Sequence, residues 1–262
     1  MNRFKIYGNR ATMASMKIKE IQAKSILSKS QVYQYALNPY IGCQHDCHYC
    51  YAKYMKRFTG HEERWGEFVD VKINAPELLT QELKRKRPGR IWISGVCDPY
   101  QPLEKKYMLT GSCLSILAEN GWSFTIQTKS ALVLRDIETL TRSNDAEVGF
   151  TITTADEQIR NLFEPGAPTI STRLAALADL HSKQIRTFVM IAPILPGAEK
   201  LVTALKGKTD YVLLDRLNYH YADRTYKRYG LQWASMNSFF SEKGDELMTA
   251  CERAGIPCRK LF

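Results

Sequence analysis

The sequence predicts an α/β fold built around a parallel sheet. Six apolar segments of strand-like composition alternate with helical segments along the 262 residues, which is the pattern of repeated β/α units. Polar motifs follow several of these strands directly, and in parallel sheets the functional groups gather where the strands end. An incomplete barrel and an open doubly wound sheet are both consistent with this pattern.

The expected elements follow one another in a regular order. Strands are predicted at residues 32–42, 90–96, 123–129, 147–154, 185–195 and 210–217. Helices are predicted within residues 50–58, 73–87, 109–121, 134–142 and 171–183. Pro76 and the Pro88-Gly89 pair are boundary signals for the second helix, Gly121 closes the third, and Ser171 is a candidate N-cap of the last.

Composition and charge narrow the class of protein. Hydrophobic residues make up 44 % of the chain, enough for a sizeable core, yet no apolar run approaches the roughly 20 residues that span a bilayer. The seven cysteines, an odd number, suit a reducing cytoplasm better than a secreted disulfide scaffold. The net charge of +10 indicates an anionic partner, either nucleic acid or a small phosphorylated substrate.

The start of the chain is basic and lacks the apolar stretch of a secretory signal. Met16 is a second possible start, which would make residues 1–15 an extension or a cloning scar. We therefore expect a lead-in at residues 1–30 and one core domain at residues 31–262 that ends in a helical segment. The sequence leaves the oligomeric state open.

Cys43, Cys47 and Cys50 fall within eight residues with the spacing C-x3-C-x2-C. A structural zinc site usually takes two separate ligand pairs, and here His45 or His48 would have to serve as a cramped fourth ligand. A [4Fe–4S] cluster has four irons that each seek a thiolate, so three cysteines would leave one iron open. The ligand count favours the cluster, with zinc as the alternative.

The C-x3-C-x2-C spacing resembles the signature of the radical S-adenosylmethionine superfamily. "GCQHDCHYCY" followed by "DPYQPLE", "TKSALVLRD", "FEPGAPT" and "APILPG" is similar to the spore photoproduct lyase-like branch of that superfamily. The resemblance implies a partial (β/α)6 TIM-like barrel and a [4Fe–4S] cluster whose open iron binds S-adenosylmethionine. It also implies a one-electron reductant of the flavodoxin or ferredoxin type, and reductive cleavage of the cofactor to a 5′-deoxyadenosyl radical.

The resemblance implies roles in cofactor binding for residues near the strand ends. Tyr49 would pack near the adenine, and Lys129 would pair with the carboxylate of S-adenosylmethionine. Asp98 matches an aspartate of the lyase and is a further candidate. The structural alternative for Lys129 is a salt bridge with Asp98 or Asp136.

Three further candidates follow later strands. Thr151 and Thr153 alternate along one strand, so both are expected on the same face, within reach of the ribose. Ala192 closes a strand with a small side chain, which would let the backbone approach the adenine. Glu164 and Arg173 are expected to form a structural ion pair.

Two residues are candidate hydrogen-atom donors, because many such reactions return a hydrogen atom to the substrate. Tyr51 matches one of the tyrosines beside the cluster in spore photoproduct lyase. Cys97 lies two residues beyond the position of the lyase's cysteine, which falls on Gly95 here. Repair of the spore photoproduct itself is therefore not implied, and a small buried side chain is the alternative reading of Cys97.

Three functions remain open on the sequence. The first is a radical enzyme acting on DNA or RNA, and the basic, tyrosine-rich stretch at residues 219–233 has a composition suited to bases and phosphates. The second is a radical enzyme that modifies a peptide, a protein or a small metabolite. The third is a non-catalytic zinc-binding module that binds nucleic acid.

Overall fold

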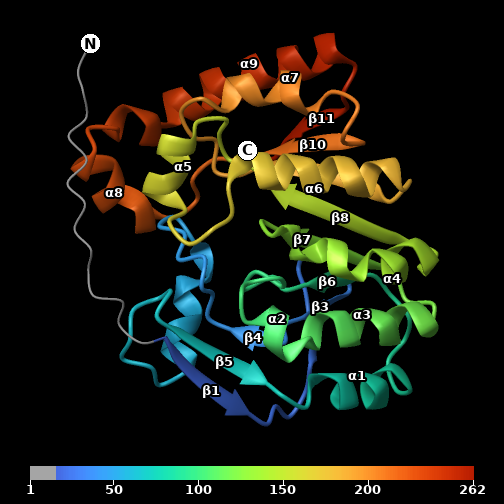
Figure 1. The fold of residues 1–262 in the computed structure, drawn as a ribbon. Helices are drawn as coiled ribbons and strands as arrows, with labels where there is room; N and C mark the ends of the chain where they lie inside the picture. The colour runs from blue at the N-terminus through green and yellow to red at the C-terminus, as the bar shows by residue number, and fades with distance from the viewer. Residues whose placement is uncertain (1–15) are drawn as a thin grey trace.

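The computed structural model describes residues 16–262, and its central element is a sheet of eight strands (Figure 1). Their order across the sheet is β11 (Cys258–Lys260), β10 (Tyr211–Leu214), β9 (Arg186–Ile191), β8 (Ala146–Thr151), β7 (Phe124–Thr128), β6 (Ile91–Ile93), β3 (Tyr35–Leu37) and β2 (Leu27–Lys29). Every neighbouring pair is parallel except β2 with β3. The predicted parallel α/β fold is therefore confirmed. The six predicted strands correspond to β3, β6, β7, β8, β9 and β10, which lie side by side in this sheet.

Helices connect the successive parallel strands. The helices that do so after β6 are, in chain order, α3 (Leu109–Glu119), α4 (Ile137–Arg142), α6 (Ile170–Ser182), α7 (Leu201–Leu205) and α9 (Asn237–Ala254). In Figure 1, α3, α4 and α6 lie on the same face of the large sheet. Within residues 16–262 no pairing joins β2 to β11, so the sheet stays open, as in the partial barrel that the resemblance implies.

Shorter elements complete the chain. The short helices are α1 (Ala75–Leu83), α2 (Glu104–Tyr107), α5 (Glu157–Phe163) and α8 (Asp223–Arg228). The 3-10 segments are η1 (Tyr51–Phe58), η2 (Ala131–Asp136), η3 (Ala198–Lys200), η4 (His220–Ala222) and η5 (Gln232–Ser235). In the part of the chain that the structure describes, no helix is both long and apolar enough to cross a bilayer.

The N-cap of α6 differs from the prediction. Thr169 rather than Ser171 caps this helix, because the Thr169 hydroxyl accepts a hydrogen bond from the backbone N–H of Thr172. Thr169 follows a proline and has the extended backbone that an N-cap residue adopts, whereas Ser171 already lies in the first helical turn.

A second, smaller sheet packs beside the first and was missed by the sequence analysis. It contains β1 (Lys17–Ile21), β5 (Phe68–Lys72) and β4 (Tyr40–Ile41), with β5 in the middle. The predicted strand at 32–42 is therefore split between the two sheets at Pro39, which has no backbone N–H to donate. Residues 17–29 of the predicted lead-in contribute β1 and β2, while residues 1–15 lie outside the described residues.

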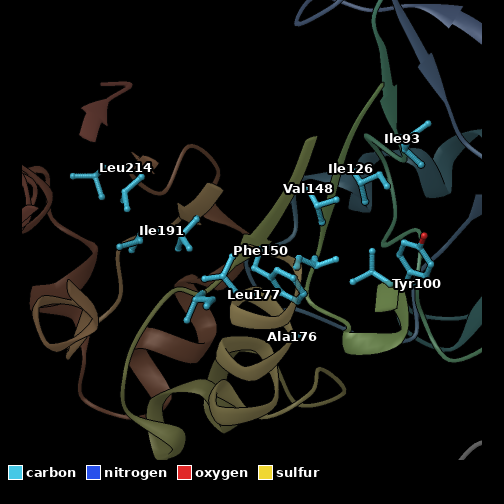
Figure 2. Packing of buried hydrophobic residues seen from close by; sticks show 14 of the residues in the cluster. Ile93, Tyr100, Ile126, Val148, Phe150, Ala176, Leu177, Ile191 and Leu214 are labelled. Carbon is cyan, nitrogen blue, oxygen red and sulfur yellow. The ribbon is translucent and has the colours of Figure 1, made fainter. Parts of the chain in front are cut away.

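The core fills the space between the large sheet and its helices. Figure 2 shows side chains from successive strands, including Ile126, Val148 and Ile191, together with Ala176 and Leu177 of α6. These side chains are almost completely buried. One apolar stripe of α6 packs against the sheet. Shortening single side chains in this stripe should therefore show how much its packing contributes to stability.

We predict that Leu177→Ala lowers the free energy of unfolding by about 2–5 kcal/mol, the usual range for removing a fully buried leucine side chain. Leu174→Ala on the same helix is the matched control, because Leu174 is only partly buried and should lose clearly less. Urea unfolding of both variants measures the difference. Equal losses would mean that the stripe of α6 facing the sheet is wrongly assigned.

Candidate active site

A cavity of about 380 Å³ opens where the parallel strands end. Its walls come from the last residues of β7 and β8 and from the segments that follow β6, β9 and β10. The remaining wall is the cysteine segment, residues 42–50 between β4 and η1, which carries the three clustered cysteines. The cavity therefore lies where parallel folds place their chemistry, and its volume suits a small cofactor.

This cavity brings together ten of the predicted site residues: Cys43, Cys47, Tyr49, Cys50, Tyr51, Cys97, Asp98, Lys129, Thr151 and Ala192. Thr153 is not among the lining residues. It is buried, and its hydroxyl donates to Glu164 Oε1 at 3.0 Å. Strand β8 ends at Thr151, so the alternation of a strand does not extend to Thr153.

The loop after β6 fixes one side of the cysteine segment. The buried side chain of Gln101 accepts a hydrogen bond from the Gln44 N–H at 3.0 Å and donates one to the Gly42 carbonyl at 3.1 Å. Gly42 has a φ of +93°, and a Cβ there would lie 2.3 Å from the Phe68 carbonyl oxygen. Only glycine fits this entry to the segment.

The "FEPGAPT" motif fixes the other side. The Phe163 carbonyl accepts a hydrogen bond from the His48 N–H at 2.8 Å, and the Gly166 N–H donates to the His45 carbonyl at 3.1 Å. A Cβ on Gly166 would lie 2.3 Å from the Gln44 carbonyl oxygen. The motif therefore clamps the cysteine segment by backbone contacts, which explains its glycine in physical terms.

Asp98 links the loop after β6 to the end of β7. Its carboxylate accepts hydrogen bonds from the Thr128 hydroxyl at 2.7 Å and from the Lys129 N–H at 2.8 Å, and His45 Nδ1 lies 3.3 Å from it. Burial raises the pKa of Asp98, but the charge and hydrogen bond of His45, together with the other donors, lower it to about 2. Much of this carboxylate's hydrogen-bonding capacity is therefore used to hold the cavity wall.

Tyr49 belongs to a buried ionic network beneath the cysteine segment. Its hydroxyl donates to Glu164, which forms an ion pair with Arg173 at 2.5 Å, and both charged side chains are fully buried. The predicted structural ion pair is thus confirmed. The Lys129 ammonium lies 5.6 Å from the centre of the Tyr49 ring.

Cys97 and Tyr51 both reach the cavity from its rim. The Cys97 thiol donates to the Tyr40 carbonyl at 3.5 Å, and burial raises its pKa to about 12. The Tyr51 hydroxyl donates to the Gly95 carbonyl, and its ring is 40 % exposed. Both groups therefore keep their hydrogen at neutral pH.

The cysteine segment fits an iron–sulfur cluster better than one zinc ion. Burial raises the pKa of Cys43, Cys47 and Cys50, so their ionised forms need a cation beside them. Three thiolates fall one short of the four ligands that a structural zinc ion usually takes. A cluster offers each thiolate its own iron and so accepts a wider spacing than one tetrahedral ion.

Comparison with known families decides the class. The model of the Radical SAM superfamily matches residues 37–200, which is more than half of the chain and contains the cysteine segment. The chain belongs to the radical SAM superfamily. Membership implies the use of S-adenosylmethionine and an iron–sulfur cluster.

Several sequence relatives of this radical SAM protein are uncharacterized proteins, and one, 24 % identical over 61 % of this chain and 33 % of its own length, is the radical SAM Nalpha-GlyT isomerase of Pseudomonas phage M6. An uncharacterized protein of Methanocaldococcus jannaschii is 33 % identical over 221 residues, covering 82 % of this chain and 83 % of that protein. An uncharacterized protein of Mycobacterium tuberculosis is 30 % identical over 68 % of this chain and 56 % of its own length. The chain thus spans little more than half of the mycobacterial relative.

A solved structure shares the fold. Spore photoproduct lyase complexed with dinucleoside spore photoproduct matches with a TM-score of 0.68 and 17 % identity, over 94 % of this chain and 82 % of that chain. A variant of that lyase with bound AdoMet and the same dinucleoside matches with a TM-score of 0.67, over 94 % and 81 % of the two chains at 17 % identity. At this identity the likeness shows a common fold.

Sequence reasoning missed several residues of the radical SAM site. Residues 215–219 after β10 line the cavity, and Gln127 reaches it from β7. Ser94 also lines it, with a φ of +60° and a buried hydroxyl that has no partner among the described residues. The rule that sites follow strand ends could have found residues 215–219, whereas the clamp by Gln101 leaves no signal in the sequence.

We predict that Gly42→Ala lowers the free energy of unfolding by about 1–3 kcal/mol more than Gly60→Ala, the usual penalty for overpacking. Both glycines have positive φ, 93° and 70°, so both variants carry the backbone strain of alanine there. Only Gly42 has a backbone oxygen in the way of a new Cβ. Urea unfolding of the metal-free protein checks this, and an equal loss in the two variants would contradict the clamp.

Proposed function

We propose that the protein is a radical enzyme whose cysteine segment holds a [4Fe–4S] cluster and whose cavity binds S-adenosylmethionine. The observation that carries the proposal is the meeting of Cys43, Cys47 and Cys50 with residues from five strand ends in one cavity. Three thiolates leave one iron of such a cluster without a protein ligand. When bound there, S-adenosylmethionine and the reduced cluster supply a 5′-deoxyadenosyl radical that abstracts hydrogen from a substrate.

The chain's own residues would position the cofactor. The nearby carboxylates, Asp98 and Glu164, are already engaged by His45 and Arg173, which supports a role for the Lys129 ammonium toward the cofactor carboxylate. The Thr151 hydroxyl accepts from Gln127 at 3.0 Å on the cavity wall, which supports a ribose contact. Ala192 leaves room for the adenine because its side chain is small.

Cys97 and Tyr51 are the proposed hydrogen-atom donors. A substrate radical in the cavity would take the hydrogen atom of Cys97: a C–H bond forms on the substrate, the S–H bond breaks, and a thiyl radical is left on Cys97. The Tyr51 O–H would restore that hydrogen atom and leave a tyrosyl radical, which one electron from an external reductant and one proton from solvent would return to the phenol. A flavodoxin- or ferredoxin-type donor in a reducing cytoplasm suits this need and also the reduction of the cluster.

Nucleic acid is the proposed substrate class. The fold is shared with a lyase whose structures contain a dinucleoside, and the chain carries a net charge of +10. At the cavity rim, Tyr51 stacks on Tyr219 with ring centres 6.3 Å apart, and both rings are at least 40 % exposed. Exposed tyrosines beside a cavity offer stacking surfaces for bases.

We predict that Cys43→Ala, Cys47→Ala and Cys50→Ala each abolish the cluster and the formation of 5′-deoxyadenosine. Each variant removes one of only three thiolates, whereas the wild type should take up about four irons and four sulfides per chain. Anaerobic reconstitution followed by iron, sulfide and product analysis measures both. A colourless wild-type protein with bound zinc would refute the proposed function.

Two further cysteines provide the controls for this experiment. Cys113→Ala removes a buried thiol of α3 outside the cavity and should keep the cluster. Cys97→Ala removes a thiol inside the cavity and should also keep both the cluster and cofactor cleavage. Loss of the cluster in Cys97→Ala would make Cys97 a fourth ligand, and the open iron would no longer exist.

A further inference from the structure

A second cavity of about 380 Å³ lies on the other side of the cysteine segment. Residues 45, 47 and 49 line the first cavity, while Asp46 and His48 line the second, so alternate side chains of one segment face the two cavities. The second cavity is completed by the start of η1, by residues 64 and 65, and by α8. None of its residues takes part in the proposed radical chemistry.

This second cavity is strongly basic. Four cationic side chains, those of Lys53, Arg64, Arg224 and Arg228, line it, against the single carboxylate of Asp46. Arg64 Nε donates to Glu67 at 3.0 Å, but among the described residues the other three cations have no carboxylate within salt-bridge distance. Cations gathered in a hollow without matching acids attract an anion.

A buried donor without an acceptor lies in the same cavity. Trp65 lines it and is 6 % exposed, and its indole N–H has no hydrogen-bond partner among the described residues. A buried N–H that stays unpaired is costly, so such groups usually find an acceptor in a ligand or a water. The indole N–H donates but cannot accept, which suits the oxygen of an anion.

Tyrosine rings join the two cavities. Tyr219 lines the first cavity, which is the proposed site of the radical chemistry (the radical cavity). Its ring stacks on that of Tyr221, with ring centres 5.9 Å apart and planes 16° apart. Tyr221 lines the basic cavity, and the Lys53 ammonium lies 6.0 Å from the centre of its ring. The Tyr219 side chain is 50 % exposed and that of Tyr221 is 42 % exposed. The partly exposed rings therefore form a continuous aromatic surface between the two cavities.

We propose that the basic cavity holds a backbone phosphate of a single-stranded polynucleotide whose reacting nucleotide enters the radical cavity. This inference rests on the proposed nucleic-acid substrate and adds where the neighbouring phosphate and bases bind. Arg224 and Arg228 contact the phosphate, the Trp65 N–H donates to it, and the neighbouring bases lie against the exposed surface of Tyr219 and Tyr221. A hollow lined by four cationic side chains suits one phosphate group better than the broad acidic face of an electron-donor protein.

The test is the binding of a fluorescent oligothymidylate of about eight nucleotides, a usual site size for one binding unit, to the full-length protein. The variant Arg224→Ala/Arg228→Ala should bind about tenfold more weakly than wild type. Its slope of log K against log salt should fall by about 0.7, the value for one phosphate of a single strand that is no longer neutralised. Trp65→Phe keeps an aromatic ring against Phe68 but loses the N–H, and should bind a few-fold more weakly.

The matched control is Arg85→Ala/Arg87→Ala, which removes the same charge from two exposed arginines after α1. It should leave the affinity and the salt slope close to those of wild type. Equal weakening in both double variants would overturn the proposal, because binding would then reflect net charge alone. Binding of inorganic pyrophosphate with no binding of the oligonucleotide would also overturn it, in favour of a small phosphorylated ligand.

The binding measurement needs neither a reduced cluster nor cofactor cleavage, so it is separate from the test of the proposed function. Unchanged oligonucleotide binding in Arg224→Ala/Arg228→Ala, combined with slower reduction of the cluster by an acidic flavodoxin, would assign this face to the electron donor and overturn the phosphate site. Weaker oligonucleotide binding in that variant would support the site even if the wild type failed to cleave S-adenosylmethionine.

Discussion

Three thiols lie together on one short segment, two of them buried and that of Cys50 partly buried, and burial makes their ionised forms unfavourable unless a cation accompanies them. The surrounding residues supply only part of that charge, because Lys129 alone opposes the rise in the pKa of both Cys47 and Cys50 from the cavity wall, while Arg173 is paired with Glu164 and His45 lies against Asp98. The segment is therefore built for a positively charged group that the protein binds from outside. An iron–sulfur cluster meets this requirement and accounts for the spacing of the thiols.

Much of the surrounding structure serves to hold that segment in place. Gln101 fastens it from the loop after β6, and the backbone of residues 163–166 fastens it from the loop after α5. Gly42 and Gly166 allow backbone approaches that any side chain would block. Because the two clamps come from different β/α units, the cysteine segment is positioned by the sheet as a whole. The same segment also separates the radical cavity from the basic one.

The sequence predicted the parallel sheet well, because β6 to β10 are short apolar runs bounded by turn signals and joined by helices. It also predicted ten residues of the cavity, since the cysteine spacing and the strand ends are local patterns. It failed where tertiary contacts decide. Pro39 splits the first predicted strand, and the second sheet forms only because β1 pairs with the distant β5.

The predicted role of Thr153 depended on strand alternation beyond the point where β8 ends. The basic cavity could not be predicted either, because Trp65 and Arg224 meet only in the folded chain. Residue types and spacing thus predicted the chemistry of the cysteine segment, while the arrangement of side chains around it required the structure.

The most direct measurement of the central claim is electron paramagnetic resonance of the reconstituted, reduced protein with and without S-adenosylmethionine. An iron without a protein ligand should bind the cofactor, so the cluster spectrum should shift, and cofactor labelled with ¹⁵N at the amino group should change the hyperfine coupling. A spectrum that S-adenosylmethionine leaves unchanged would contradict the claim that the cysteine segment exposes an open iron to this cofactor.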